Sequence, residues 1–144
     1  MQIASAAGSG AAQTLGTASS AITIGTASTT GTLEYTGATD ATLNRAITVN
    51  GADGAILKNS GGALLTLGGT ITRASLPLTF SGGAFNVTGQ ITGASSTLTV
   101  NGATVTLSQA TNNYVGNTVV QGHCPTRPRW FSVERRATRA APTT

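Results

Sequence analysis

Apolar and polar residues alternate in short runs along most of the chain. Clear examples are "LTL" at 65–67 and "LTV" at 98–100. Alternation with a period of two is typical of a β-strand that buries one face. Pairs such as Asn101–Gly102 end these runs, as tight turns require. Gly and Thr discourage helix, and residues 1–122 contain no amphipathic helical pattern. The pattern therefore predicts an all-β structure of short strands.

These runs recur in blocks of equal length along the second half of the repeat region. Three consecutive blocks align without a gap: "LTLGGTITRASLPLTFSGGA" from Leu65, "FNVTGQITGASSTLTVNGAT" from Phe85 and "VTLSQATNNYVGNTVVQGHC" from Val105. A similar block that opens at Ile47 is slightly shorter. Each block holds two alternating runs, so we expect two strands and two turns in every repeat.

This period predicts a parallel β-helix, or β-solenoid, in which each block of about 20 residues forms one coil. Equivalent residues would then stack about 4.8 Å apart on successive coils. The predicted inward-facing core ladders consist of Leu65, Leu67, Phe80, Phe85, Val87, Val100, Val105, Leu107 and Val120. The Thr, Asn and Ser residues between them should face outward. A β-sandwich is the main alternative, but it does not predict gapless self-similarity between blocks of this length.

Composition divides the chain at about residue 122. Residues 1–122 hold three basic and three acidic residues, whereas 123–144 hold five arginines and one glutamate, which is the whole net charge of +4. All 19 glycines lie before this boundary. We therefore divide the chain into an irregular N-terminal segment (1–14), a solenoid repeat region (15–122) and a basic, irregular tail (123–144).

Cysteine content and hydropathy exclude two structural features, a disulfide framework and a membrane-spanning helix. Cys124, the only cysteine, lies in the tail, so the repeat region can form no disulfide. No apolar run approaches the ~18–20 residues that a membrane helix needs. Aromatic residues are 4% of the chain, but the aliphatic runs and the neutral repeat region are unlike a disordered chain.

The segment from Gly31 to Ile71 resembles the passenger regions of bacterial autotransporters that carry autotransporter-associated β-strand repeats. Those stretches run G-x-L-x-Y-x-G, then R-x-I-x-V-x-G, then N-S-G-x-G-x-L-x-L-x-G. The matching residues here are Gly31, Leu33, Tyr35, Gly37, Arg45, Ile47, Val49, Gly51, Asn59, Ser60, Gly61, Leu65, Leu67 and Gly69.

Residues 103–122 resemble the short repeat motif of the same family, L-x-G-x-x-x-Y-x-G-x-T-x-V-x-x-G. The matching residues are Leu107, Tyr114, Gly116, Thr118, Val120 and Gly122. Gln109 stands where the motif has Gly. Taken together, the resemblance covers residues 15–122.

The resemblance implies a right-handed parallel β-helix that is secreted across the outer membrane and displayed, extracellularly, at the bacterial cell surface. A C-terminal β-barrel translocator normally follows, and residues 123–144 are too few to hold its strands. Besides neighbouring coils, a host surface or a carbohydrate is the kind of partner that the resemblance suggests, and the ligand itself stays open.

The tail departs from the family pattern. The repeats normally continue with more Gly, Ala and Thr, whereas this chain turns to "HCPTRPRWF" at His123. Glycine and alanine codons rich in G and C, read one frame out, encode arginine, alanine, proline and tryptophan. We hypothesise that residues 123–144 are a frameshifted reading of a longer repeat array, and that the chain is a fragment.

Catalytic chemistry finds little support in the repeat region. A polysaccharide-active β-helix needs clustered acids with a basic partner or a metal. Glu34 should point away from the core, and Asp40 and Asp53 lie in turn-like segments. Calcium-binding solenoids place an Asp in every coil, and these coils do not. We therefore expect no enzyme activity, and no catalytic residue, cofactor or metal site.

The tail offers two further candidates. His123 and Cys124 are adjacent but lack the additional ligands that zinc requires. Arginines beside Trp130 and Phe131 could hold nucleic acid through phosphate contacts and stacking. An out-of-frame or disordered tail is the favoured interpretation, so no nucleic-acid partner is expected.

The sequence thus predicts a fragment of a surface-displayed passenger that acts as a structural stalk or an adhesin. One alternative is a fragment of a polysaccharide-active β-helix enzyme whose catalytic coils lie outside this chain. Another is a β-domain with a basic, nucleic-acid-binding tail.

Overall fold

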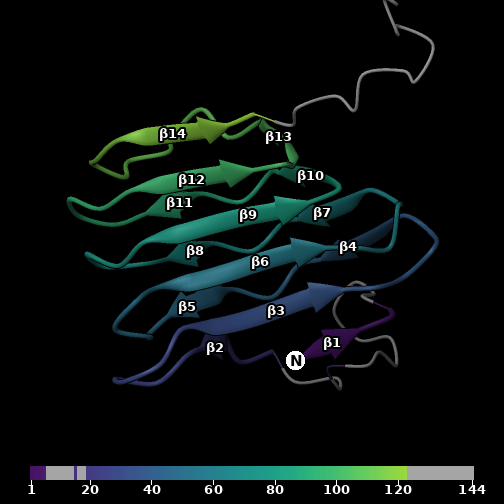
Figure 1. Cartoon of the computed structure of the whole chain (residues 1–144), viewed down its shortest axis with the longest axis horizontal. Coiled ribbons are helices and arrows are strands. Elements are labelled where there is room, and N and C mark those ends of the chain that lie inside the picture. The colour runs from purple at the N-terminus through teal and green to yellow at the C-terminus, as the bar shows by residue number, and fades with distance from the viewer. Residues whose placement is uncertain (6–14, 16–18, 123–144) are drawn as a thin grey trace, which may run out of the picture.

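The computed structural model describes residues 1–5, 15 and 19–122, and in these ranges the chain forms only strands, turns and loops. Figure 1 shows the strands wound into coils that are stacked one above the other. Each of four successive coils contributes one strand to each of three parallel sheets. The chain is therefore an all-β solenoid, as the repeat predicts. These same residues contain no helix long and apolar enough to cross a membrane.

The three sheets form the faces of the solenoid. The long sheet contains, in order, β1 (Gln2–Ile3), β3 (Gly31–Tyr35), β6 (Ala55–Asn59), β9 (Leu78–Gly82), β12 (Leu98–Asn101) and β14 (Thr118–Gln121). The second sheet contains β4 (Ala41–Leu43), β7 (Leu65–Leu67), β10 (Ala84–Val87) and β13 (Thr104–Leu107). The third contains β2 (Ile22–Ile24), β5 (Ile47–Val49), β8 (Ile71–Thr72) and β11 (Ile91–Thr92).

Each coil has three strands, whereas the alternation predicts two. The strand that the sequence does not reveal belongs to the third sheet, where β8 and β11 are only two residues long. A two-residue strand shows no alternation that a sequence pattern could detect. Ile71 and Ile91 are nevertheless fully buried and paired in register, so this short strand closes the core on its third side.

Coil length changes along the stack. Leu65 pairs with Phe85, and Phe85 with Val105, so the later coils keep the length of the sequence blocks, as predicted. The earlier coils are longer, because Ile47 pairs with Ile71 in the third sheet. The shorter block at 47–64 was aligned so that Ile47 corresponds to Leu65, and this register is wrong.

Most of the additional residues lie in the loop between the long sheet and the second sheet, and one lies in the turn between β5 and β6. This loop spans 60–64 after β6, but only Gly83 separates β9 from β10. The buried amide of Asn59 supports the longer loop, because its Nδ2 donates to Ala63 O at 2.7 Å. The same Nδ2 donates to Ala84 O of the next coil at 2.8 Å. One polar side chain thus closes its own loop and links two coils.

The predicted ladders lie in register inside the solenoid. Phe85 lies between Leu65 and Val105, Val87 between Leu67 and Leu107, and Val100 between Phe80 and Val120. The ladder members on β7, β9 and β10 are buried, and the Phe80 and Phe85 rings pack edge to face with centroids 5.2 Å apart.

The ladder residues of the last described coil are exposed or half-buried. Val120 is 71% exposed and Leu107 36%, while Val100 and Val105 are half-buried. The prediction that Val120 and Leu107 belong to a closed core is therefore wrong for the described residues. An inward-facing residue is covered only when a coil lies on both sides, and no described coil lies beyond β14.

The N-terminal segment, predicted to be irregular over 1–14, begins with a strand. β1 pairs in parallel with β3, and the backbone N–H groups of Glu34 and Thr36 donate to Met1 and Ile3 carbonyl oxygens at 2.9 and 2.8 Å. Ile3 is 1% exposed and extends the core below β3. The free edge of β3 explains this strand, since unpaired backbone groups favour the addition of another strand.

Glycine is required where the corners of neighbouring coils meet. A Cβ atom on Gly89 would lie 2.1 Å from the carbonyl oxygen of Gly69 in the coil below. Coils spaced by one strand separation leave no room for a side chain at such corners. The high glycine content therefore follows from the stacking.

A matched pair of valine substitutions tests the burial gradient. Val87→Ala should lower the free energy of unfolding by about 2 kcal/mol, because it removes two buried methyl groups and leaves a cavity. Val120→Ala should change it by less than about 0.5 kcal/mol, because that side chain is largely exposed. Urea unfolding followed by circular dichroism measures both, and equal losses would contradict the described end of the core.

Candidate functional site

Rows of residues, nearly all of them β-branched, run along the outside of all three sheets, and each row is called a file. On the third sheet the file is unbroken threonine, and on the others threonine predominates. The files are Thr23, Thr48, Thr72 and Thr92; Thr42, Thr66, Asn86 and Thr106; and Thr32, Ile56, Thr79, Thr99 and Val119. These hydroxyl-rich faces agree with the prediction that Thr and Asn between the ladder positions face outward.

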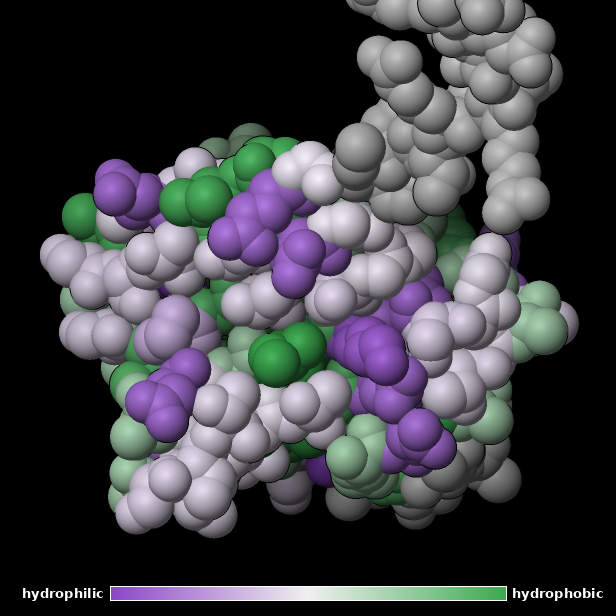
Figure 2. Space-filling model, in the orientation of Figure 1, coloured by the Kyte–Doolittle hydropathy of each residue, from purple (hydrophilic) through white to green (hydrophobic). Residues whose placement is uncertain are grey.

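The outer face of the long sheet carries a second, more polar file. It consists of Gln2, Glu34, Lys58, Ser81, Asn101 and Gln121, one from each strand. Figure 2 shows this face as mostly pale, with separate hydrophilic patches and small hydrophobic ones. We call this file the polar file. It is the largest set of hydrogen-bonding side chains that the stacking brings into line, and so the candidate contact surface.

Glu34 is the centre of the only side-chain ion pair within the described ranges. Its carboxylate lies 2.9 Å from Lys58 Nζ and accepts hydrogen bonds from Ser60 Oγ at 2.6 Å and Gln2 Nε2 at 2.9 Å. Lys58, then Ser60 and Gln2, lower the pKa of Glu34 from 4.5 to about 2. These contacts join three strands, β1, β3 and β6, through side chains on the solvent side.

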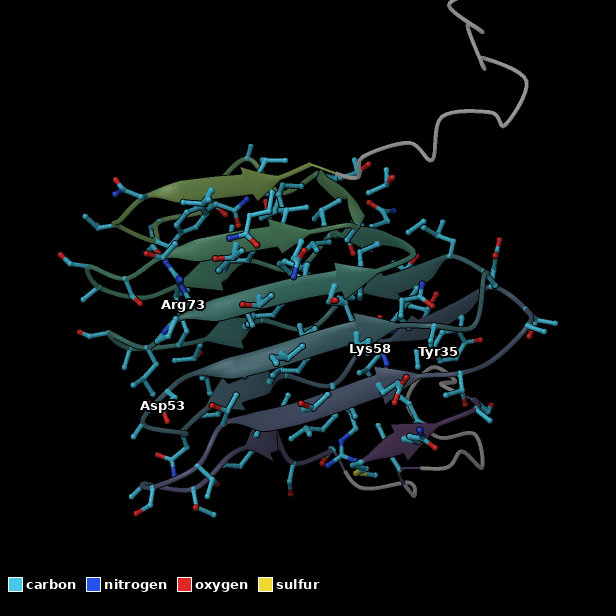
Figure 3. The ribbon with its side chains drawn as sticks, viewed as in Figure 1. Tyr35, Asp53, Lys58 and Arg73 are labelled. Carbon is cyan, nitrogen blue, oxygen red and sulfur yellow. The ribbon has the colours of Figure 1, made fainter. Side chains whose placement is uncertain are left out.

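The other two acids of the repeat region lie apart from this network. Asp40 Oδ1 accepts a hydrogen bond from Leu64 N at 2.8 Å, and so joins two loops. Asp53 is exposed in a turn, and Figure 3 shows it far along the face from Lys58. The structure therefore does not bring Glu34, Asp40 and Asp53 together.

The groups of the polar file are suited to binding. A carboxylate whose pKa is held at about 2 is ionised at neutral pH, so Glu34 is a poor general acid. In the described ranges no three His, Cys, Asp or Glu side chains cluster as metal ligands would. The polar file can donate and accept hydrogen bonds, which suits contact with another surface or with hydroxyl-rich chains.

The matched residues of the repeat motif build the last coil. Tyr114 is half-buried and its hydroxyl lies 3.1 Å from Thr118 Oγ1, at the start of β14. Gly116 between them has φ +132°, and a Cβ atom there would lie 2.1 Å from Ser96 O. Leu107, Val120 and Gly122 are exposed on this coil. The Tyr114–Thr118 hydrogen bond and the close approach at Gly116 thus place these residues in the last described coil.

Arg73 is one of the three basic residues of the repeat region, yet it is 0% exposed. Its Nη1 and Nη2 donate to the carbonyl oxygens of Thr97 and Ser96 at 2.8 and 2.9 Å. Its Cζ lies 5.1 Å from the centroid of the Tyr114 ring, a cation–π distance. Burial lowers the pKa of Arg73. A single arginine in one block gives no sequence signal that it lies inside.

A hollow of about 250 Å³ lies at the N-terminal end of the stack. It is lined by Met1, Ile22, Thr23, Ile24, Gly25, Gly31, Thr32 and Leu33. Among these residues only Met1 carries a titratable group, the N-terminal ammonium, which donates to Thr32 O at 3.0 Å. The rest of its lining consists of apolar side chains, two threonines and two glycines.

The candidates in the tail, His123, Cys124, Trp130 and Phe131, lie outside the described residues. Comparison of the chain with protein-family models, curated proteins and solved structures finds no match.

The Glu34 network predicts a dependence of stability on pH. Since the folded pKa lies below 4.5, ionised Glu34 stabilises the fold above pH 4.5, and this contribution is lost as the pH falls towards 2. Lys58→Met should raise the Glu34 titration midpoint, measured by NMR, and Lys58→Arg should leave it near 2. A midpoint close to 4.5 in the unsubstituted chain would show that the network does not form.

Proposed function

We propose that this chain is a piece of a surface-displayed bacterial passenger whose solenoid acts as a structural stalk. The observation that carries the proposal is the difference in residue type between the inward and outward sides of the coils. Inward-facing positions carry mainly apolar side chains that pack against one another. Outward positions carry mainly threonine, serine and amide side chains. This pattern recurs from coil to coil, which suits a rod that extends by adding repeats.

The resemblance of residues 15–122 to autotransporter passengers supports display at the cell surface. Solenoids of this kind gain length without a change of cross-section, because each repeat contacts only its neighbours. A rod that projects from a cell also needs a hydrophilic exterior, and the threonine files and the polar file supply one. An adhesive role would use the same outer faces, with the polar file as the contact surface.

Surface labelling of the source cells tests the proposal. Antibodies raised against residues 19–122 should label intact cells, and protease added outside should remove the label. A cytoplasmic protein probed in parallel should resist the protease until the cells are permeabilised. Labelling that appears only after permeabilisation would exclude display at the surface and with it the stalk.

A further inference from the structure

The two ends of the solenoid differ in how their strand edges are covered. At the N-terminal end, β1 occupies the outer edge of β3, where the Met1 ammonium donates to Thr32 O at 3.0 Å. Thr36 N donates to Ile3 O of the same strand at 2.8 Å. At the other end, β13 and β14 are the outermost strands of their sheets, and no described strand pairs with their outer edges. We call this end, formed by residues 104–121, the open end (Figure 1).

Apolar side chains gather at the open end. Of the five large hydrophobic side chains that are exposed among the described residues, four belong to it: Leu107, Val115, Val119 and Val120. Figure 2 shows hydrophobic side chains grouped at this end of the molecule. Val120 is exposed although it continues the inward column of Phe80 and Val100. The surface left bare here is therefore the one that the next coil covers elsewhere in the stack.

The residues of the last coil do not protect this edge. Natural edge strands are commonly protected from other chains by charged side chains, prolines or bulges. Residues 103–122 contain no Lys, Arg, Asp, Glu or Pro. The covered end, by contrast, carries the Met1 ammonium and the ion pair between Glu34 and Lys58. An uncharged, apolar edge favours the addition of a further strand.

A second copy of the chain fits the open end better than the chain's own tail does. Pro125 and Pro128 follow β14 closely, and proline lacks the N–H that a strand in a ladder donates. The tail also carries five arginines, whose charges an apolar surface accommodates poorly. A second copy offers the same exposed apolar side chains and the same unpaired backbone edges.

Symmetry selects how the two copies meet. Docking of the open end on the N-terminal end of another copy would have to displace β1, and would generate an open filament. Docking of open end on open end gives a closed, two-fold dimer in which β14 pairs antiparallel with its counterpart. The two tails then start from opposite ends of the strand pair, which separates their charges of +4 each.

We propose that the open end is a dimer interface through which two copies of this chain stack coil on coil, with Val120 on the two-fold axis. Directly opposite residues of an antiparallel pair point to the same face, so Val120 packs against its counterpart. The inward column of Phe80, Val100 and Val120 thereby continues into the second copy. The interface leaves the outer faces free, so it does not depend on the proposed stalk function.

Sedimentation velocity of the full chain tests the interface. The parent chain should sediment with the mass of two chains. Val120→Lys places a charge on the axis and should halve that mass, while the far-UV circular dichroism stays unchanged because Val120 is largely exposed in the single chain. Thr72→Lys is the matched control, since it adds the same charge at an exposed position of β8, away from the open end, and should remain dimeric.

Disulfide trapping locates the axis, in a chain carrying Cys124→Ser. Val120→Cys should form a covalent dimer several-fold faster than Thr72→Cys, because position 120 lies opposite its counterpart across the axis. A cross-link no faster than that of Thr72→Cys would overturn the proposal. So would a dimer that persists in Val120→Lys, or a mass that keeps rising with concentration as in a filament. A monomeric parent would also overturn it, and is the result expected if residues 123–144 cover the open end instead.

Discussion

The stacking of like residues on successive coils is the interaction on which this structure depends. A single coil orders its backbone at a cost of roughly 1–2 kcal/mol per residue, and its few inward side chains each contribute roughly 1.5–3 kcal/mol on burial. Hydrogen bonds and packing between coils must supply the rest. The ladder Leu65–Phe85–Val105 shows both contributions, because the same parallel pairing that aligns the backbones places the side chains in contact.

The exceptions to like-on-like stacking are informative. Tyr35, Asn59 and Gly82 occupy one register position on β3, β6 and β9, and Asn59 uses this place to hold a loop and the next coil together. On the third side of the core, Arg73 follows β8, and the equivalent residue of the next block is Gly93, so unlike residues are stacked. In both cases a buried polar side chain donates hydrogen bonds to backbone carbonyl groups of the neighbouring coil, and so links two coils.

Much of the fold could be predicted, because the gapless blocks place Leu65, Phe85 and Val105 in equivalent positions. The short third strand could not, since Ile71–Thr72 is too brief to alternate. The register of Ile47 was mistaken because the block alignment matched β5 of the third sheet with β7 of the second, whose alternating patterns are alike.

The candidate surface was only partly foreseeable. Alternation predicts that Glu34 and Lys58 face outward, but their pairing at 2.9 Å depends on a coil longer than the sequence blocks, which no block alignment reveals. Arg73 was not identified as buried, because an arginine beside a turn normally lies in solvent. Such residues become visible only when the coils are placed in space.

The register of Ile47 is the most direct test of the whole arrangement. NMR cross-relaxation in a methyl-labelled chain should give contacts between Ile47 and Ile71, which lie side by side on β5 and β8. Contacts between Ile47 and Leu65 in their place would support the alignment of the sequence blocks, and would contradict the three-sided coil described for this chain.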